Sequence, residues 1–94
     1  MPYLLIHHKV SDYETWKSVF DEHASTRKEN GSKGGWLLHN AGDPNDIFII
    51  LEWDSVDHAR RFVNSEDLKQ TMKMAGVSGS VHAYFLEQID RPES

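Results

Sequence analysis

The sequence contains no cysteine among its 94 residues. This absence excludes disulfides, thiolate metal sites and cysteine nucleophiles, so stability must come from packing or from self-association. Basic residues are in the minority, because ten Lys and Arg stand against fifteen Asp and Glu, which gives a net charge of -5. Binding to a phosphate backbone needs clustered positive charge. We therefore expect no nucleic-acid partner.

Long apolar runs are also missing. No stretch approaches the ~18 apolar residues of a membrane span, and residues 1–8 lack the basic region and cleavage site of a signal peptide. We therefore expect a cytoplasmic protein without a membrane partner. A chain of 10.8 kDa buries roughly 65% of its surface on folding, so its core is adequate but thin. This length holds one domain, residues 1–94, with 89–94 as a polar tail.

Hydrophobic periodicity predicts a strand, a helix, two strands, a second helix and a last strand, in that order. Their expected ranges are 3–9, 11–30, 36–39, 47–53, 55–75 and 81–88. Ser11 and Glu14 have the spacing of a capping box at the start of the first helix, and Gly31 is a stop signal at its end. Asp54 or Ser55 can cap the second helix, and Ser65 can recap the chain for Leu68, Met72 and Ala75.

The order β-α-β-β-α-β is the signature of a ferredoxin-like α+β protomer, with a four-stranded antiparallel sheet and helices on one face. A sheet covered on one side should alternate apolar and polar residues. Residues 47–51 are instead apolar at both parities, as are 4–6 and 83–86. The helices can bury only one face, so we expect a second copy to cover the other. The predicted assembly is a homodimer joined through the open sheet faces.

The stretch DYETWKSVFDEH at 12–23, followed by Arg27 and Gly31, resembles the small dimeric α+β barrel proteins grouped with antibiotic-biosynthesis monooxygenases. Residues 43–45, 52–54 and 75–77 resemble them too. The resemblance implies a ferredoxin-like protomer, a dimer and a pocket between sheet and helices. Proteins of this superfamily include cofactor-independent oxygenases of polyketide quinols, haem-degrading oxygenases and lactone isomerases. The haem-degrading branch would place an asparagine on the first strand, where His7 and His8 stand here.

One face of the first predicted helix turns polar toward its end. Trp16, Phe20, His23 and Arg27 fall within an arc of about 60° on a helical wheel. If they border a pocket, His23 can move a proton and Arg27 can stabilise an enolate oxygen. In the alternative interpretation, His23 is hydrogen-bonded in the core and Arg27 reaches a helix carboxylate.

The strand histidines supply a second candidate base. Adjacent strand residues point to opposite faces, so only one of His7 and His8 can face the helices. We select His8, because it lies on the same face of the strand as Leu4 and Ile6. In the alternative interpretation, it is a histidine at the end of the strand that is half exposed to solvent. Further candidates for a substrate pocket, or for plain core packing, are Trp53, Tyr84 and His82.

No short histidine motif indicates a metal, and a site would need long-range convergence of His8, His23 and Glu52. The sequence therefore predicts a homodimer that binds a small aromatic or polyketide-like molecule, with no cofactor and no metal. As an enzyme it would be a cofactor-independent monooxygenase with His8 or His23 as base and Arg27 as electrostatic stabiliser. The alternatives are a noncatalytic binding or structural dimer, a tautomerase that uses the amine of Pro2, and a haem-binding oxygenase.

Overall fold

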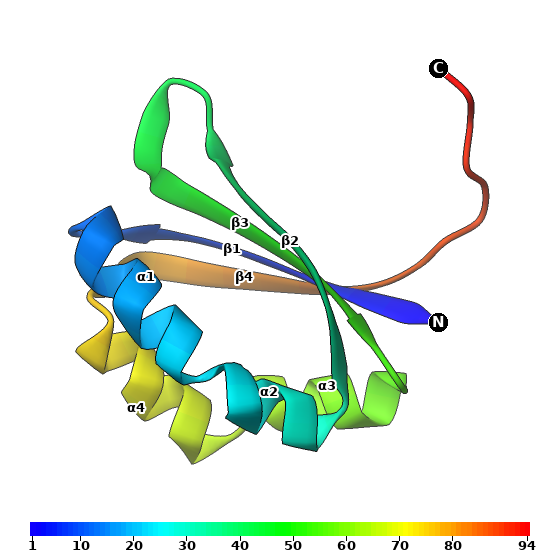
Figure 1. Ribbon diagram of the computed structural model, residues 1–94, viewed down its shortest axis with the longest axis horizontal. Helices are drawn as coiled ribbons and strands as arrows, with labels where there is room; N and C mark the ends of the chain where they lie inside the picture. Colours follow the sequence, from blue (N-terminus) through cyan, green and yellow to red (C-terminus); the bar gives the residue numbers. More distant parts are fainter.

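A four-stranded antiparallel sheet forms one layer of the protein and four helices form the other, as the computed structural model of residues 1–94 shows (Figure 1). The strands are β1 (Pro2–Val10), β2 (Ser32–Asn40), β3 (Asp43–Trp53) and β4 (Val77–Glu87), in the order β2-β3-β1-β4. The helices are α1 (Tyr13–Glu22), α2 (Ala24–Asn30), α3 (Val56–Val63) and α4 (Glu66–Met74). The predicted ferredoxin-like α+β class is confirmed. None of the helices is long and apolar enough to cross a membrane.

Each of the two predicted helical segments is broken into two helices. The break at Ser65, the N-cap of α4, was predicted, whereas the break at His23 was not. The first helix begins one residue later than its capping box indicated. Asp12 is the N-cap, because its Oδ2 accepts from the Thr15 backbone N–H at 3.0 Å and the Thr15 hydroxyl at 2.8 Å. Ser11 instead donates its backbone N–H to the Gly76 carbonyl at 2.9 Å. Two short helices can follow a twisted sheet more closely than one straight helix.

The strands are longer than the hydrophobic pattern indicated. β2 begins at Ser32 and β4 at Val77, in segments rich in glycine and serine whose composition is typical of loops. Backbone pairing overrides that composition, since Gly34 and Gly35 lie opposite Glu52 and Leu51 of β3. The turn between β2 and β3 is correspondingly short, at 41–42.

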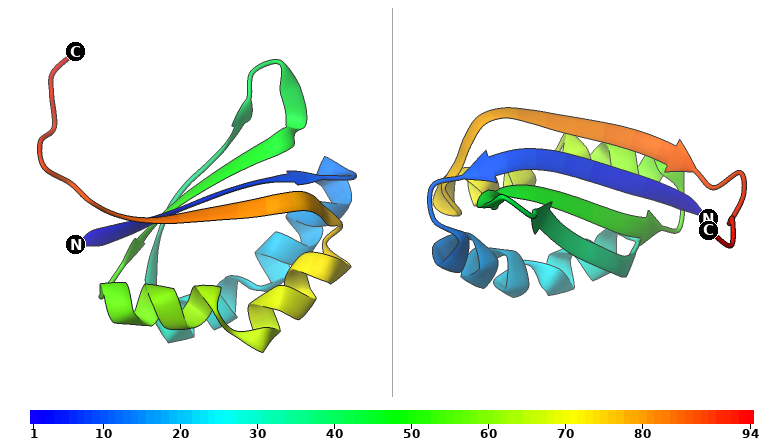
Figure 2. Two further views of the ribbon diagram at one scale, coloured as in Figure 1. Left: turned by 180° about the vertical axis from the view of Figure 1, so that it is seen from behind. Right: turned by 90° about the horizontal axis from the view of Figure 1, so that it is seen from above.

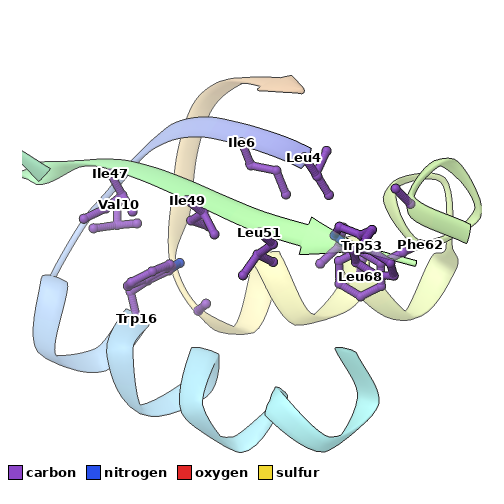
Figure 3. Close-up of a cluster of buried hydrophobic side chains, with 12 residues drawn as sticks. Leu4, Ile6, Val10, Trp16, Ile47, Ile49, Leu51, Trp53, Phe62 and Leu68 are labelled. Atoms are coloured by element: carbon purple, nitrogen blue, oxygen red, sulfur yellow. The ribbon is translucent and has the colours of Figure 1, made fainter. Parts of the chain in front are cut away.

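The hydrophobic core lies between the sheet and the helices (Figure 3). Alternate residues of the central strands point into it, so Leu4, Ile6 and His8 of β1 are buried. No helix or loop covers the other side of the sheet (Figure 2). We refer to this side as the open sheet face. Cross-strand pairing places these large side chains on it: Tyr3, Leu5, His7, Trp36, Leu38, Phe48, Ile50, His82, Tyr84 and Leu86.

Gly35 marks the closest approach of β2 to β3. A Cβ at this position would collide with the backbone carbonyl of Ile50, which cannot move without disturbing the ladder. We expect Gly35→Ala to lower the free energy of unfolding by about 1–3 kcal/mol. Gly42→Ala is the matched control, because its Cβ would meet only Asn40 Oδ1, at 3.6 Å. Denaturant unfolding of both variants measures the difference, and equal stability would contradict the assigned pairing.

Candidate functional site

His8 is buried between sheet and helices. β1 directs its side chain toward α1, where its ring meets Trp16 edge-on with centroids 5.8 Å apart. The residue is 2% exposed, and its Nδ1 has no hydrogen-bond partner. Burial lowers the pKa of His8 below its ordinary 6.5, the residue's own backbone opposes this shift, and the nearby His7 adds to the lowering. Near neutral pH the imidazole is therefore uncharged and can accept a proton.

Phe20 and Arg27 form a stacked pair at the junction of α1 and α2. The Arg27 guanidinium carbon lies 3.7 Å from the centroid of the Phe20 ring, and Nη1 donates to the Phe20 carbonyl at 2.7 Å. Phe20 stacks in turn on Trp16 at 4.9 Å. Burial lowers the pKa of Arg27, while the Asp21 carboxylate opposes the shift. The expected alternative partner, a helix carboxylate, forms no ion pair with this guanidinium.

His23 lies at the break between α1 and α2, where the backbone adopts φ -84° and ψ 0°. Its Nε2 is 2.7 Å from Asp67 Oδ2 at the start of α4, and its ring packs near Phe62 at 5.9 Å. The side chain is 11% exposed, whereas that of Asp67 is 63% exposed. The imidazole is thus oriented by a carboxylate that the sequence pattern did not identify as its partner.

These side chains border one cavity of about 40 Å³. Its lining combines five residues selected from the sequence, His8, Trp16, Phe20, His23 and Arg27, with core positions of β1, β3 and the helices. Among the latter, Thr71 contributes a hydroxyl and Met72 a thioether from α4. Neither was selected as a site residue, although the helical periodicity of 65–75 had placed Met72 on the inward face.

Three other candidates lie elsewhere. Tyr84 and His82 are on the open sheet face, because they pair with Leu5 and His7. Trp53 is fully buried against Phe62, with ring centroids 5.1 Å apart, but does not line the cavity. The structure therefore corrects the expectation that these three residues form a pocket with the helix residues. The register of β4 determines which side of the sheet Tyr84 and His82 occupy. The sequence did not define this register, because β4 is apolar on both faces.

Neither Glu52 nor Pro2 lies at the cavity with His8 and His23. Glu52 pairs with Tyr3 and shares the open sheet face, so it does not converge with His8 and His23. The structure contains no group of three or more metal-binding side chains. Pro2 begins β1 and pairs with Glu87, at the opposite end of the strand from His8.

Comparisons with known proteins agree with this fold. No family model matches the chain. Over 65 residues it is 35% identical to a Haloarcula marismortui protein whose name proposes heme binding, a match that covers 68% of this chain and 10% of that protein. The chain thus spans about a tenth of the length of this curated relative.

Solved structures match over nearly the whole chain. A Bordetella bronchiseptica protein, named provisionally as an antibiotic biosynthesis monooxygenase, is 13% identical with a TM-score of 0.79, covering 94% of this chain and 96% of its own. A mutant of SnoaB, a cofactor-independent oxygenase from Streptomyces nogalater, is 15% identical with a TM-score of 0.76, covering 99% and 97%. The chain therefore has the ferredoxin-like α+β fold of structures named antibiotic biosynthesis monooxygenases, and the resemblance seen in the sequence is confirmed for the fold.

The lowered pKa of His8 has a measurable consequence. The unfolded chain takes up a proton near the ordinary pKa of 6.5, which the folded protein resists. The stability that neutral His8 contributes is therefore complete above pH 6.5 and is lost as the pH falls from 6.5 through the lower folded pKa. We expect the NMR titration midpoint of His8 to lie below 6.5. We also expect the stability difference between wild type and His8→Gln to shrink across this window, and a difference independent of pH would contradict the assignment.

Proposed function

We propose that this protein binds a small aromatic, polyketide-like molecule in the cavity and oxygenates it without a cofactor. The observation that carries the proposal is that His8, whose Nδ1 atom is buried and unpartnered, lines a cavity together with aromatic side chains. Buried polar atoms normally have a partner, so an unpartnered base in a cavity favours a role in binding or catalysis. The fold shared with SnoaB supports the same reaction class.

The proposed reaction begins with proton transfer to His8. The neutral imidazole accepts a proton from an acidic C–H of the substrate, which leaves an enolate. Arg27 lies at the edge of the cavity and uses one N–H on the Phe20 carbonyl, so its remaining donors can stabilise the enolate oxygen. Dioxygen then adds to the carbanion carbon, and the hydroperoxide loses water. A CH₂ group and O₂ become a carbonyl and water, so dioxygen is the oxidant.

His23 is the weaker candidate for the base. Its Nε2 already faces the Asp67 carboxylate at 2.7 Å, an arrangement that orients the ring and occupies this nitrogen. We therefore assign the proton abstraction to His8 and a positioning role beside Phe62 to His23.

The size of the cavity sets a condition on binding. Small-molecule sites measure about 300–1,000 Å³, whereas this cavity of about 40 Å³ holds only a few water molecules. The partly exposed Phe20 and Arg27 are the side chains whose movement would enlarge it. The small volume favours the second candidate, a noncatalytic dimer in which Asp67 and the Phe20 carbonyl simply satisfy His23 and Arg27.

Haem does not fit these residues. An axial imidazole needs a flat slot beside its nitrogen, but Trp16 packs 5.8 Å from His8 and Phe20 stacks behind Trp16 at 4.9 Å. Trp16 is a core residue, 3% exposed. Accommodating a macrocycle would displace core aromatics rather than side chains at the edge of the cavity. The proposed reaction therefore does not use haem.

Oxygen uptake with 1,8-dihydroxyanthrone, a tricyclic aromatic ketone with an acidic CH₂ group, tests the oxygenase. We expect His8→Gln to lower kcat by about 10²–10⁴-fold and Arg27→Ala by about 10²–10³-fold. His39→Gln is the control, because this exposed strand histidine bonds only the adjacent Asn40 carbonyl. Wild-type turnover no faster than the uncatalysed reaction would favour the noncatalytic dimer. Full activity of His8→Gln would show that His8 is not the base.

We also propose that two copies associate through the open sheet face. Trp36 and Tyr84 are 58% and 50% exposed there, beside several other large apolar side chains. A contiguous apolar surface of this kind is typical of an interaction site. The limited core of a chain this short adds a reason for sharing that surface.

Light scattering at micromolar concentration should give about twice the chain mass of 10.8 kDa. Leu38→Glu with Tyr84→Glu places two carboxylates on the open sheet face and should yield monomers, because burying them unpaired costs several kcal/mol. Met74→Glu is the matched control, since Met74 is 72% exposed on α4, away from the sheet. A wild-type mass near 10.8 kDa would reject the dimer.

A further inference from the structure

A second, larger depression lies between α2 and β2, outside the cavity. The chain leaves α2 at Asn30 and turns at Gly31 into β2, so helix and strand diverge from a shared corner (Figure 1). The groove between them measures about 590 Å³. One wall comes from α1 and α2 and the other from residues 32–37 of β2, with Leu51 of β3 also in its lining.

All the charged residues that line this groove are cations, namely Arg27, Lys28 and Lys33. None of the three forms an ion pair, whereas Lys9, Lys17 and Lys69 elsewhere do. No carboxylate lines the groove, although acidic residues outnumber basic ones in the chain. Asp21 attracts Arg27 electrostatically, and Asp54 attracts Lys33, but neither carboxylate lines the groove. Asp54 Oδ1 is also hydrogen-bonded to His58 Nδ1 at 2.9 Å. The groove is therefore suited to an anion.

The strand wall of the groove includes two residues without side chains, Gly34 and Gly35. Gly34 has φ +86° and no neighbouring atom within 4 Å of where a Cβ would stand, and Gly35 follows it. Trp36, the next residue, also lines the groove, but its ring lies on the open sheet face, 6.4 Å from the ring of Tyr3. An aromatic ligand thus has room beside β2.

The groove and the cavity share a wall. Phe20, Arg27 and Leu51 line both, and the stacked Phe20–Arg27 pair is the part of the wall that is not core. A ligand anchored by the lysines would therefore place its adjacent ring against the pair that separates it from His8.

We propose that this groove is an anion site that holds the carboxylate of an aromatic acid, the ring of which enters the cavity. The placement of the ring rests on the proposed function; the assignment of Lys28 and Lys33 as specificity-determining residues rests on the groove alone. The groove runs along α2 from Ala24 to Lys28, and its three cationic groups match a single carboxylate. The positive charge comes entirely from side chains.

Binding of 2-naphthoate and 2-naphthol tests the assignment, because the two share a ring system but only 2-naphthoate carries an anionic group at neutral pH. Calorimetry should show 2-naphthoate bound about tenfold more tightly by the wild type, with the advantage decreasing as salt rises. Lys28→Ala/Lys33→Ala should remove about that tenfold for 2-naphthoate and leave 2-naphthol unchanged. Lys69→Ala/Lys73→Ala on α4 makes the same change of net charge outside the groove and should alter neither affinity.

The outcomes separate the groove from the proposed function. Equal affinities for the two compounds, unaffected by Lys28→Ala/Lys33→Ala, would overturn the anion site and leave cavity binding standing. Loss of 2-naphthoate affinity in that variant, with no effect of the cavity variant Ala75→Val on either compound, would support the anion site and count against the proposed function alone. If neither compound binds the wild type, both assignments fall.

Discussion

The alternation of side chains along β1, in a sheet covered on one side only, is the constraint on which the rest of the structure depends. Leu4, Ile6 and His8 point toward the helices, and Leu5 and His7 point away. The inward set builds the core and brings an imidazole to the cavity. The outward set leaves an apolar surface that the chain itself does not cover. Core, candidate site and association surface therefore follow from one strand and its register.

Burying His8 without a partner for Nδ1 carries a cost that an apolar side chain of similar size would avoid. An orphaned atom does not by itself indicate function, since Trp53 Nε1 is also buried and unpartnered. The difference lies in the surroundings. Trp53 is packed in the core, whereas His8 borders a cavity together with His23 and Arg27. Of these two residues with an unpartnered nitrogen, only His8 lines the cavity.

The sequence allowed prediction of the fold class, the inward parity of His8 and the shared face of Trp16, Phe20, His23 and Arg27, because these depend on local periodicity. It did not reveal the helix break at His23 or the contribution of Asp67, which comes from α4 across 44 positions of the chain. The sequence did not determine which side of the sheet His82 and Tyr84 occupy, because β4 is apolar on both faces. Its pairing with β1 also shifts between His7 and Lys9, so no local pattern determines which side chains face inward.

The net charge of -5 argued against nucleic acid, yet it does not oppose a small anion in the groove. A polyanion extends over a large part of the protein surface and is repelled by its many carboxylates. A single carboxylate interacts mainly with charges within the Debye length of about 8 Å at physiological salt. Within the groove those charges are Arg27, Lys28 and Lys33. An acidic chain can thus exclude one class of anionic partner and select another, because the deciding quantity is the local arrangement of charge rather than its sum.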